Sequence, residues 1–284
     1  ENQGFDISVT AKVLALKDFS WEISAGLGHY KNEVTALPDG DKPVYTSLYG
    51  GEVVTQVGGP VGLFYGYKTQ GVFSTSEDAA FAGLRDGRAD GDVFRGGDMH
   101  FADLVADAVI DEKDKTVIGD PNPDIFGNFG TSLHYKNWTL NAFFSYSLGN
   151  DIYNYQRAVL EGGSTYYNQT TAVLNRWTSE GQVTEIPRAE LGDPMGNSRF
   201  SDRWIEDGSY LKLKTLSLSY RIPFNYTFLQ GITVWAAANN VFTCTKYLGS
   251  DPELSISSSA VGQGIDRGLL GRGRSFVLGV KINL

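Results

Sequence analysis

The chain has 284 residues and a formal net charge of -9, which disfavours a nucleic-acid partner because phosphate binding needs clustered Lys and Arg. Its 34 Gly, 15 Tyr and 16 Phe beside only 2 Met favour strands and turns over helices. The single cysteine, Cys244, excludes an internal disulfide. No apolar run reaches the roughly eighteen residues of a membrane helix, so a helical membrane protein is also excluded.

Seven segments alternate apolar and polar residues with the period of a β-strand, and each has about the length of a tilted membrane strand. In the first segment every second residue from Phe5 to Ala15 is apolar. Alternate side chains in a strand point to opposite faces, so the pattern predicts antiparallel strands with one apolar face. The segments are residues 5–15, 19–28, 126–135, 138–148, 210–223, 232–242 and 274–284.

The connections between these segments alternate between short and long. Short connections lie near Lys17, near Lys136 and at residues 223–231. Long connections cover residues 31–125, 149–209 and 244–273, far beyond the usual loop. All short turns would therefore lie at one end of the sheet and all long loops at the other, as in outer-membrane barrels with short periplasmic turns and long extracellular loops.

Aromatic residues gather beside the short turns, where a membrane barrel carries its interfacial girdle. The expected girdle residues are Trp21, Tyr135, Trp138, Tyr220, Phe224, Tyr226 and Phe228.

Counting strands gives a second inference. Bacterial single-chain barrels have an even number of strands, whereas this chain has seven, and an open edge in lipid leaves unpaired backbone groups. We therefore expect the chain to be the C-terminal part of a larger barrel whose other strands lie upstream of Glu1.

The segment 210–223 alternates in two phases. Its apolar residues occupy odd positions up to Leu213 and even positions from Leu216 onward. The second phase alone covers residues 216–222, which is shorter than the roughly nine to eleven residues that a membrane strand needs. The phase must therefore change within the strand, or the strand must leave the membrane early.

Two lysines decide between these alternatives. If the even phase continued without interruption, Lys212 and Lys214 would point into lipid, which destabilises the barrel by about 2 to 4 kcal/mol for each lysine near the bilayer midplane. A β-bulge near Thr215 would shift the phase by one residue, turn both lysines into the lumen and add Leu211 and Leu213 to the lipid face. Otherwise the lysines already stand above the membrane; we favour the bulge.

Several long motifs resemble one family. The sequence contains "GDPNPDIFGNFGTSLHYKNWTLNAFFSYSLGNDIYNY", "RFSDRWIEDGSYLKLKTLSLSYRIP", "VWAAANNVFTCTKYLGSDPE" and "GRGRSFVLGVKINL". In this order they resemble the C-terminal half of SusC/RagA-type TonB-dependent outer-membrane transporters. "GPVGLFYGYKTQGVFSTSEDA" and "DKTVIGDPNPD" resemble the large loop of that family.

The resemblance implies a barrel of about 22 strands with a plugged lumen. It implies import of oligosaccharides or peptides, with energy relayed by TonB and with a SusD-type surface lipoprotein as a lid over the extracellular mouth. The plug and the TonB-contacting segment belong to the N-terminal part of such proteins and have no counterpart in this sequence. The chain is therefore expected to supply wall and loops in the bacterial outer membrane, without the gate.

One acidic segment has the register of a twelve-residue calcium loop, whose ligands occupy positions 1, 3, 5, 9 and 12 and whose position 6 is Gly. Val105 replaces the ligand at position 3, and Ala108 at position 6 resists the positive φ that Gly supplies. A bound calcium ion and an acidic solvated hairpin are the two interpretations. The candidate ligands are Asp103, Asp107, Asp111 and Asp114.

No arrangement of residues points to an enzyme, because the three histidines are scattered and no convergent acid, base or nucleophile is present. Aromatic residues of the second long loop are candidates for stacking on sugar rings or packing against a lid protein, and the alternative is that they pack the loop upon itself. We expect an all-β transmembrane barrel portion that imports nutrients; the rival is a soluble, secreted β-rich glycan-binding module. The candidate aromatics are Tyr153, Tyr155, Tyr166, Tyr167 and Trp177.

Overall fold

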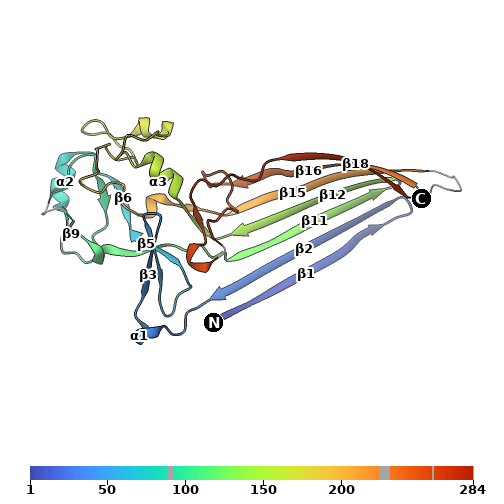
Figure 1. Ribbon diagram of the computed structural model, residues 1–284, viewed down its shortest axis with the longest axis horizontal. Coiled ribbons are helices and arrows are strands. Elements are labelled where there is room, and N and C mark those ends of the chain that lie inside the picture. Colours follow the sequence, from blue (N-terminus) through green and yellow to red (C-terminus); the bar gives the residue numbers. More distant parts are fainter. Residues whose placement is uncertain (89–91, 224–230, 258, 284) are drawn as a thin grey trace.

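A computed structural model describes residues 1–88, 92–223, 231–257 and 259–283. The chain divides into a long seven-stranded sheet and a compact region at one end of it (Figure 1). We call the sheet the wall. Its long connections are loop 1 (residues 33–124), loop 2 (149–209) and loop 3 (246–274), and together they form the loop domain.

All seven predicted strands are present, and they lie side by side in chain order, each antiparallel to the next. The alternation of short turns and long loops is therefore confirmed, because every long connection leaves from the same end of the wall (Figure 1). The wall strands are β1 (Asn2–Ala15), β2 (Phe19–Asn32), β11 (Ile125–Tyr135), β12 (Trp138–Leu148), β15 (Tyr210–Ile222), β16 (Gly231–Thr245) and β18 (Ser275–Asn283).

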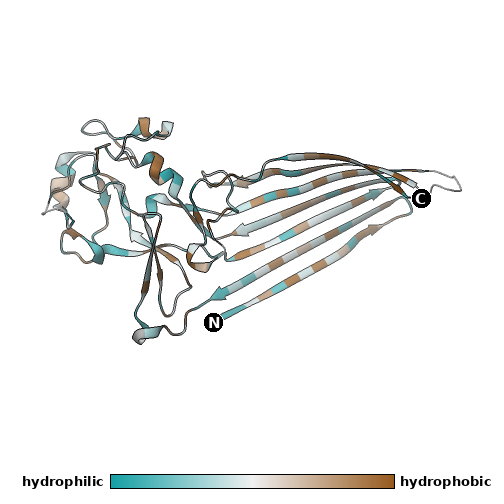
Figure 2. Cartoon of the chain, in the orientation of Figure 1, coloured by the Kyte–Doolittle hydropathy of each residue, from teal (hydrophilic) through white to brown (hydrophobic). Residues whose placement is uncertain are grey.

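The strand registers place most apolar side chains of the seven strands on one face, which we call the apolar face; Phe126, Phe143 and Trp235 are exceptions. Phe129 pairs with Ala25 on one side and Phe144 on the other, and the two Phe rings stack with centroids 4.4 Å apart. Many residues on this face are open to the surroundings, with Phe276 81% and Leu278 83% exposed, whereas Leu213, between Phe144 and Phe242, is buried. Figure 2 shows apolar and polar residues alternating along the wall strands. We call the opposite side the polar face.

Aromatic residues line the short-turn end of the apolar face. Tyr135 pairs with Phe19 and Trp138, and Trp138 pairs in turn with Tyr220 at a ring-centroid distance of 4.6 Å. Three of the predicted girdle residues, Tyr135, Trp138 and Tyr220, therefore form one row across three strands, which Phe19 extends to β2, and Trp21 lies one step further along the apolar face, beside Leu133. Phe224, Tyr226 and Phe228 lie outside the described residues.

The register of the wall shifts within β1, within β15 and between β15 and β16, and of these the shift in β15 was expected. In β15, Leu213 pairs with Phe144 and Thr215 with Phe143, so Lys214 is the extra residue and the predicted bulge is confirmed. In β1 the extra residue is Val13, and Leu14 pairs with Trp21. The expectation of one unbroken apolar phase from Phe5 to Ala15 is therefore wrong beyond Ala11.

The long connections are folded rather than extended loops. In loop 2 and loop 3, β13 lies between β14, which is antiparallel to it, and β17, which is parallel to it, so one small sheet joins the two loops. Loop 1 contributes a four-stranded sheet in the order β10-β5-β4-β3. The elements of loop 1 are α1 (Pro38–Asp41), β3 (Val44–Leu48), β4 (Gly51–Thr55), β5 (Leu63–Tyr67), β6 (Thr69–Val72), α2 (Ser76–Ala82), β7 (Arg85–Asp86), β8 (Met99–Phe101), β9 (Val109–Ile110), the 3-10 helix η1 (Glu112–Asp114) and β10 (Lys115–Gly119); those of loops 2 and 3 are β13 (Asp151–Asn154), α3 (Tyr155–Glu161), η2 (Thr171–Asn175), η3 (Asp202–Trp204), β14 (Ile205–Asp207), η4 (Ala260–Gly262) and β17 (Ile265–Asp266).

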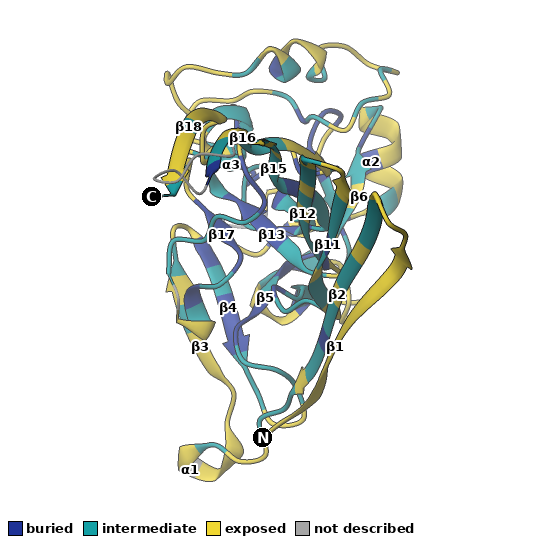
Figure 3. Ribbon diagram, turned by 90° about the vertical axis from the view of Figure 1, so that its right-hand side faces the viewer, coloured by how far each residue is buried: buried dark blue, intermediate teal, exposed yellow. Residues whose placement is uncertain are grey.

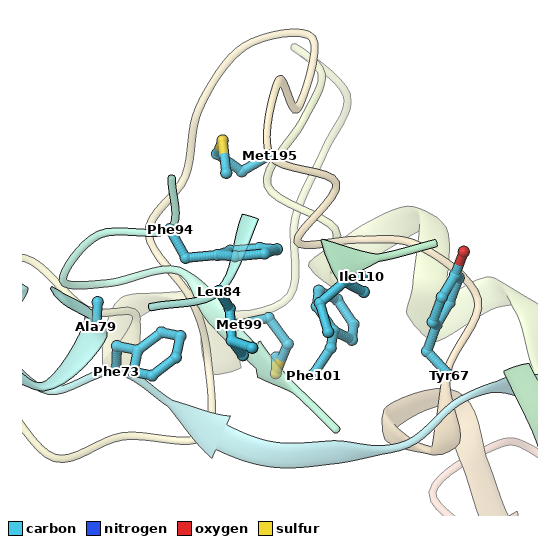
Figure 4. Packing of buried hydrophobic residues seen from close by; sticks show 9 residues of the cluster. All are labelled: Tyr67, Phe73, Ala79, Leu84, Phe94, Met99, Phe101, Ile110 and Met195. Carbon is cyan, nitrogen blue, oxygen red and sulfur yellow. The ribbon is translucent and has the colours of Figure 1, made fainter. Parts of the chain in front are cut away.

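Two apolar clusters hold the loop domain together. The first belongs mainly to loop 1, where Phe94, Phe101 and Ile110 are buried, and Met195 of loop 2 joins it (Figure 4). The second draws on all three loops. Because each loop contributes buried side chains to a shared core, the loop domain behaves as one folded body. Its second cluster consists of Val53, Phe64, Tyr153, Trp204 and Ile265.

The loop domain lies across the end of a curved wall. Seen along the strands, the wall forms an arc from β1 to β18, and β4, β5, β13 and β17 lie across the hollow of that arc (Figure 3). The polar face therefore leads toward the loop domain. No helix among the described residues is long and apolar enough to cross a membrane.

Candidate functional site

The polar face carries many small polar side chains that bond across neighbouring strands, beside larger residues such as Phe143 and Trp235. Asn141 Nδ2 donates to Ser217 Oγ at 3.4 Å, and Thr215 Oγ1 donates to Asn239 Oδ1 at 3.2 Å. Asn239 Nδ2 in turn donates to Ser275 Oγ at 3.2 Å. Because such groups keep spare donors and acceptors for water, this face suits a hydrated passage rather than a packed core.

An ion cluster lies where the polar face of β15 meets loop 3. Lys212 Nζ lies 2.8 Å from Asp251 Oδ2 and 2.7 Å from Glu253 Oε2. Lys214 also pairs with Glu253, and Tyr210 Oη donates a hydrogen bond to Glu253 Oε1 at 3.1 Å. The expected turn of both lysines away from the apolar face is therefore confirmed, and their partners belong to the loop domain.

The cluster favours the ionised carboxylates. Burial alone would raise the pKa values of Asp251 and Glu253, but the hydrogen bonds from Lys212, and from Lys214 in the case of Glu253, outweigh it and hold both pKa values below their ordinary range. Lys212 is only 2% exposed, so its two carboxylate partners supply the counter-charge that a buried ammonium requires.

A cavity of 310 Å³ lies on one face of the four-stranded sheet of loop 1. Strand pairing places Ser47 opposite Glu52, and Tyr67 opposite Lys115, on this face. Burial raises the pKa of Tyr65, which also lines the cavity, to about 12. The cavity thus combines aromatic walls with donors and acceptors of both charges, and its other charged lining residues are Arg88, Glu112 and Arg199.

A buried carboxylate holds two arginines beside this cavity. Asp86 is fully buried, and its Oδ2 accepts hydrogen bonds from Arg88 Nη2 at 2.8 Å and Arg199 Nη2 at 3.0 Å. Arg199 also stacks over the ring of Phe101, at 4.4 Å from its centroid. Asp86 belongs to loop 1 and Arg199 to loop 2, so the ion pair fastens the two loops together.

The five candidate aromatic residues do not form one cluster. Tyr153 is buried in the second apolar core, and Tyr155 packs beside it with ring centroids 6.1 Å apart. Trp177 Nε1 donates to Ser74 O at 2.9 Å, which ties loop 2 to loop 1. Tyr166 and Tyr167 are 89% and 70% exposed, so they alone present most of their surface outward.

The calcium-type loop uses its carboxylates to cap its own backbone. Asp103 accepts hydrogen bonds from Ala106 N at 2.7 Å and Ala108 N at 2.8 Å. The buried Asp114 accepts from Leu104 N at 2.8 Å and from Asp111 N at 2.9 Å. Ala108 adopts a φ of 60° despite its Cβ, so these hydrogen bonds impose the conformation for which Gly was expected.

These residues do not fit a calcium ion. Lys113 Nζ lies 3.3 Å from Asp111 Oδ2 and 3.7 Å from Asp107 Oδ2, where a cation would have to bind. Within the described ranges, no three His, Cys, Asp or Glu side chains are grouped so that they could hold a metal ion. The segment is a folded acidic turn whose carboxylates bond its own backbone, and its strand β9 pairs in parallel with β7.

Sequence reasoning missed the buried ion pairs. Asp86 and Arg199 are more than a hundred residues apart, and no local pattern relates them. Lys212 was located correctly, but its partner Asp251 lies in a loop with no strand alternation to orient it. A charged residue in phase with a polar strand face indicates which side it occupies but not what it contacts.

No protein-family model matches the chain. TonB-dependent receptor P3 of Formosa agariphila is 33% identical over 297 residues, which cover 99% of this chain and 28% of that receptor. TonB-dependent receptor SusC of Bacteroides thetaiotaomicron is 26% identical, with 99% of this chain and 26% of SusC covered.

Solved structures show the same fold. A structure of the RagAB peptide transporter superposes with a TM-score of 0.78 at 23% identity, covering 99% of this chain and 29% of the matched chain. The RagAB importer in its "closed-closed" state gives a TM-score of 0.76 at 24% identity. Wall and loop domain are thus both matched along nearly the full chain. Over nearly its full length the chain is thus similar to part of the TonB-dependent receptors of the SusC/RagA type, and it spans a little more than a quarter of the length of the relatives it matches.

Proposed function

We propose that this chain supplies part of the wall and the outer mouth of an outer-membrane importer that takes up nutrient oligomers, using energy from a TonB system. One observation carries the proposal: the wall has an apolar face that no described part of the chain covers, and a polar face that leads to the loop domain. In a barrel the first face meets lipid and the second meets water.

The edges of the wall support a larger barrel. β1 and β18 are the two edges of the sheet, and β1 is exposed along its whole length. Unpaired backbone groups in lipid cost several kcal/mol each, so both edges need partner strands. We therefore propose that the chain is the C-terminal portion of a barrel of about 22 strands, with the plug and the TonB-contacting segment in the rest of the receptor.

The substrate belongs to the class of oligomers too large for porins. The RagAB structures are named for a peptide transporter, whereas the names of the other relatives state no substrate. Peptide and oligosaccharide therefore both remain candidates. Uptake of labelled oligopeptides and oligosaccharides by cells with and without this receptor, each with and without TonB, tests the proposal. Equal uptake in receptor-deleted cells, or uptake independent of TonB, would contradict it.

We also propose that a SusD-like lipoprotein covers the outer surface of loop 2. This segment exposes large apolar side chains far from the wall, an arrangement typical of protein contacts (Figure 1). The exposed residues are Tyr166 (89%), Tyr167 (70%), Leu174 (76%), Val183 (90%) and Leu191 (59%).

Replacing Tyr166, Tyr167 and Leu174 together by Ser should weaken co-purification of the lipoprotein with the full-length receptor. The matched control is Leu270→Ser, which alters a side chain of loop 3 that is 95% exposed. Undiminished co-purification of the triple variant would place the lid elsewhere.

The rival function, a soluble glycan-binding module, requires that the protein cover its own apolar face. Side chains on that face of β18 instead remain open, including Val280 at 63% and Ile282 at 57% exposure. Extraction of the receptor only by detergent is the expected result. A monomer that is soluble in plain buffer and melts cooperatively would support the rival.

A further inference from the structure

Loop 3 is attached in two different ways at its two halves. Its later half joins the loop domain through backbone contacts, because β17 pairs with β13 and Tyr153 N donates to Gly264 O at 2.8 Å. Its earlier half meets the wall through the side chains of Asp251 and Glu253. Loop 3 therefore links the rest of the loop domain to the wall through an ion cluster.

Glu253 is the centre of this cluster. It accepts from Tyr210 Oη and from the ammonium groups of Lys212 and Lys214, three side chains at alternate positions of β15. The bulge at Lys214 puts this row on the polar face while residues from Leu216 onward keep their apolar phase. The carboxylate of Glu253 thus bonds three side chains of the wall.

Loop 3 borders a cavity at this point. Tyr210, Ser147 and the stretch 252–255 all line that cavity of 310 Å³. The charged side chains hold the stretch on the side of the wall, while on its other side Ile256 packs against the second apolar cluster and its backbone N donates to Ile265 O at 3.0 Å.

We propose that Tyr210, Lys212 and Lys214 of the wall, together with Asp251 and Glu253 of loop 3, form an electrostatic latch that holds the loop domain against the wall. Opening this latch frees the stretch 250–256 to move relative to the polar face. The inference goes beyond the import function, because it concerns how the mouth is held and not what passes through it.

The charges within the latch balance. Two lysines face two carboxylates, and Tyr210 adds a neutral donor. Because a carboxylate bonded to ammonium groups loses its attraction when protonated, acid should loosen the latch.

Hydrogen exchange of the full-length receptor tests the latch. Glu253→Gln keeps the shape of the side chain and removes its charge, and should raise exchange of amides in residues 250–256 by roughly tenfold. Lys214→Met should produce a smaller rise, because Lys212 keeps both carboxylates. Adding Lys214→Met to Glu253→Gln should then change little, because the contact between the two residues is already broken.

The control is Glu190→Gln, which removes the same charge from an exposed pair with Arg188. Exchange in residues 250–256 should stay as in the wild type. The latch is refuted if Glu253→Gln leaves this exchange unchanged, if the control raises it equally, or if Lys214→Met and Glu253→Gln act additively. Lys214→Met retains the Lys212 pairs, so it remains informative if Glu253→Gln fails to fold.

Discussion

The substitution Asp86→Asn probes the charge that fastens loop 1 to loop 2. Asp86 is fully buried and accepts hydrogen bonds from Arg88 N at 3.1 Å, Arg88 Nη2 at 2.8 Å and Arg199 Nη2 at 3.0 Å. Arg199 has a side chain that is only 6% exposed, and among the described residues its Nη1 has no hydrogen-bond partner. Asparagine preserves the volume and one acceptor but leaves this guanidinium without its nearest counter-charge.

The magnitude follows from the burial of the two arginines. Removing one partner of a buried ion pair typically costs about 3 to 5 kcal/mol, because the other charge remains buried. The side chain of Arg88 is 44% exposed, so solvent screens its interaction with Asp86, and the loss of that interaction contributes little to the change in stability. We therefore expect a loss of about 3 kcal/mol in the stability of the loop domain, nearly all of it from Arg199.

The same contribution should depend on pH. Burial would raise the pKa of Asp86, but the hydrogen bond from Arg88 and the charge of Arg199 hold it below the ordinary value of 3.8. A carboxyl whose pKa is lowered by folding stabilises the protein fully above its unfolded pKa and loses that effect as pH falls through its folded pKa. The difference between wild type and Asp86→Asn should therefore be full at neutral pH and shrink below about pH 4.

Hydrogen exchange of the full-length receptor measures this effect in β7, β9 and residues 195–199. The control is Asp107→Asn, which makes the same chemical change in a side chain that is 39% exposed. A loss below about 1 kcal/mol, the range of a surface pair, would refute the assignment. An equal loss in an Arg199→Met background would also refute it, because the cycle would show no coupling between the two residues.

Three further predictions concern the wall, the acidic hairpin and the latch. Gly127→Val should block barrel assembly, because a Cβ at this position would lie 2.1 Å from Gly26 O. Loss of heat-dependent gel mobility would show this. The control Gly273→Val should assemble, because the space around Gly273 is open. Chelation of divalent ions should leave protease cleavage within residues 103–114 unchanged, because Lys113 already neutralises Asp111; protection by added calcium would contradict this. Folding lowers the pKa values of Asp251 and Glu253 below their ordinary values of 3.8 and 4.5. Hydrogen exchange in residues 250–256 should therefore rise as the pH falls below these ordinary values. If the exchange rate, corrected for its intrinsic pH dependence, stays constant down to pH 3, the prediction is wrong.

The candidate sites show where sequence reasoning failed. Tyr153 and Tyr166 looked alike as loop aromatics, yet one is 3% and the other 89% exposed. No alternation marks these positions, so only the packing of three loops separates a core residue from a surface residue. The acidic segment had the spacing of a calcium loop, but the reach of Lys113 and the backbone capping by Asp103 and Asp114 depend on the folded turn.

The sequence by itself determined the seven strands and their order and favoured the bulge in β15, because side-chain direction in a strand repeats every two residues and is therefore a local property. It also carried the family resemblance through long motifs that remain readable in isolation. Only the tertiary structure decided that the long connections form one domain, that Val13 is bulged on β1, and that Lys212 meets Asp251. Those features depend on contacts between residues far apart in the chain, and no local periodicity records which distant side chain fills a given space.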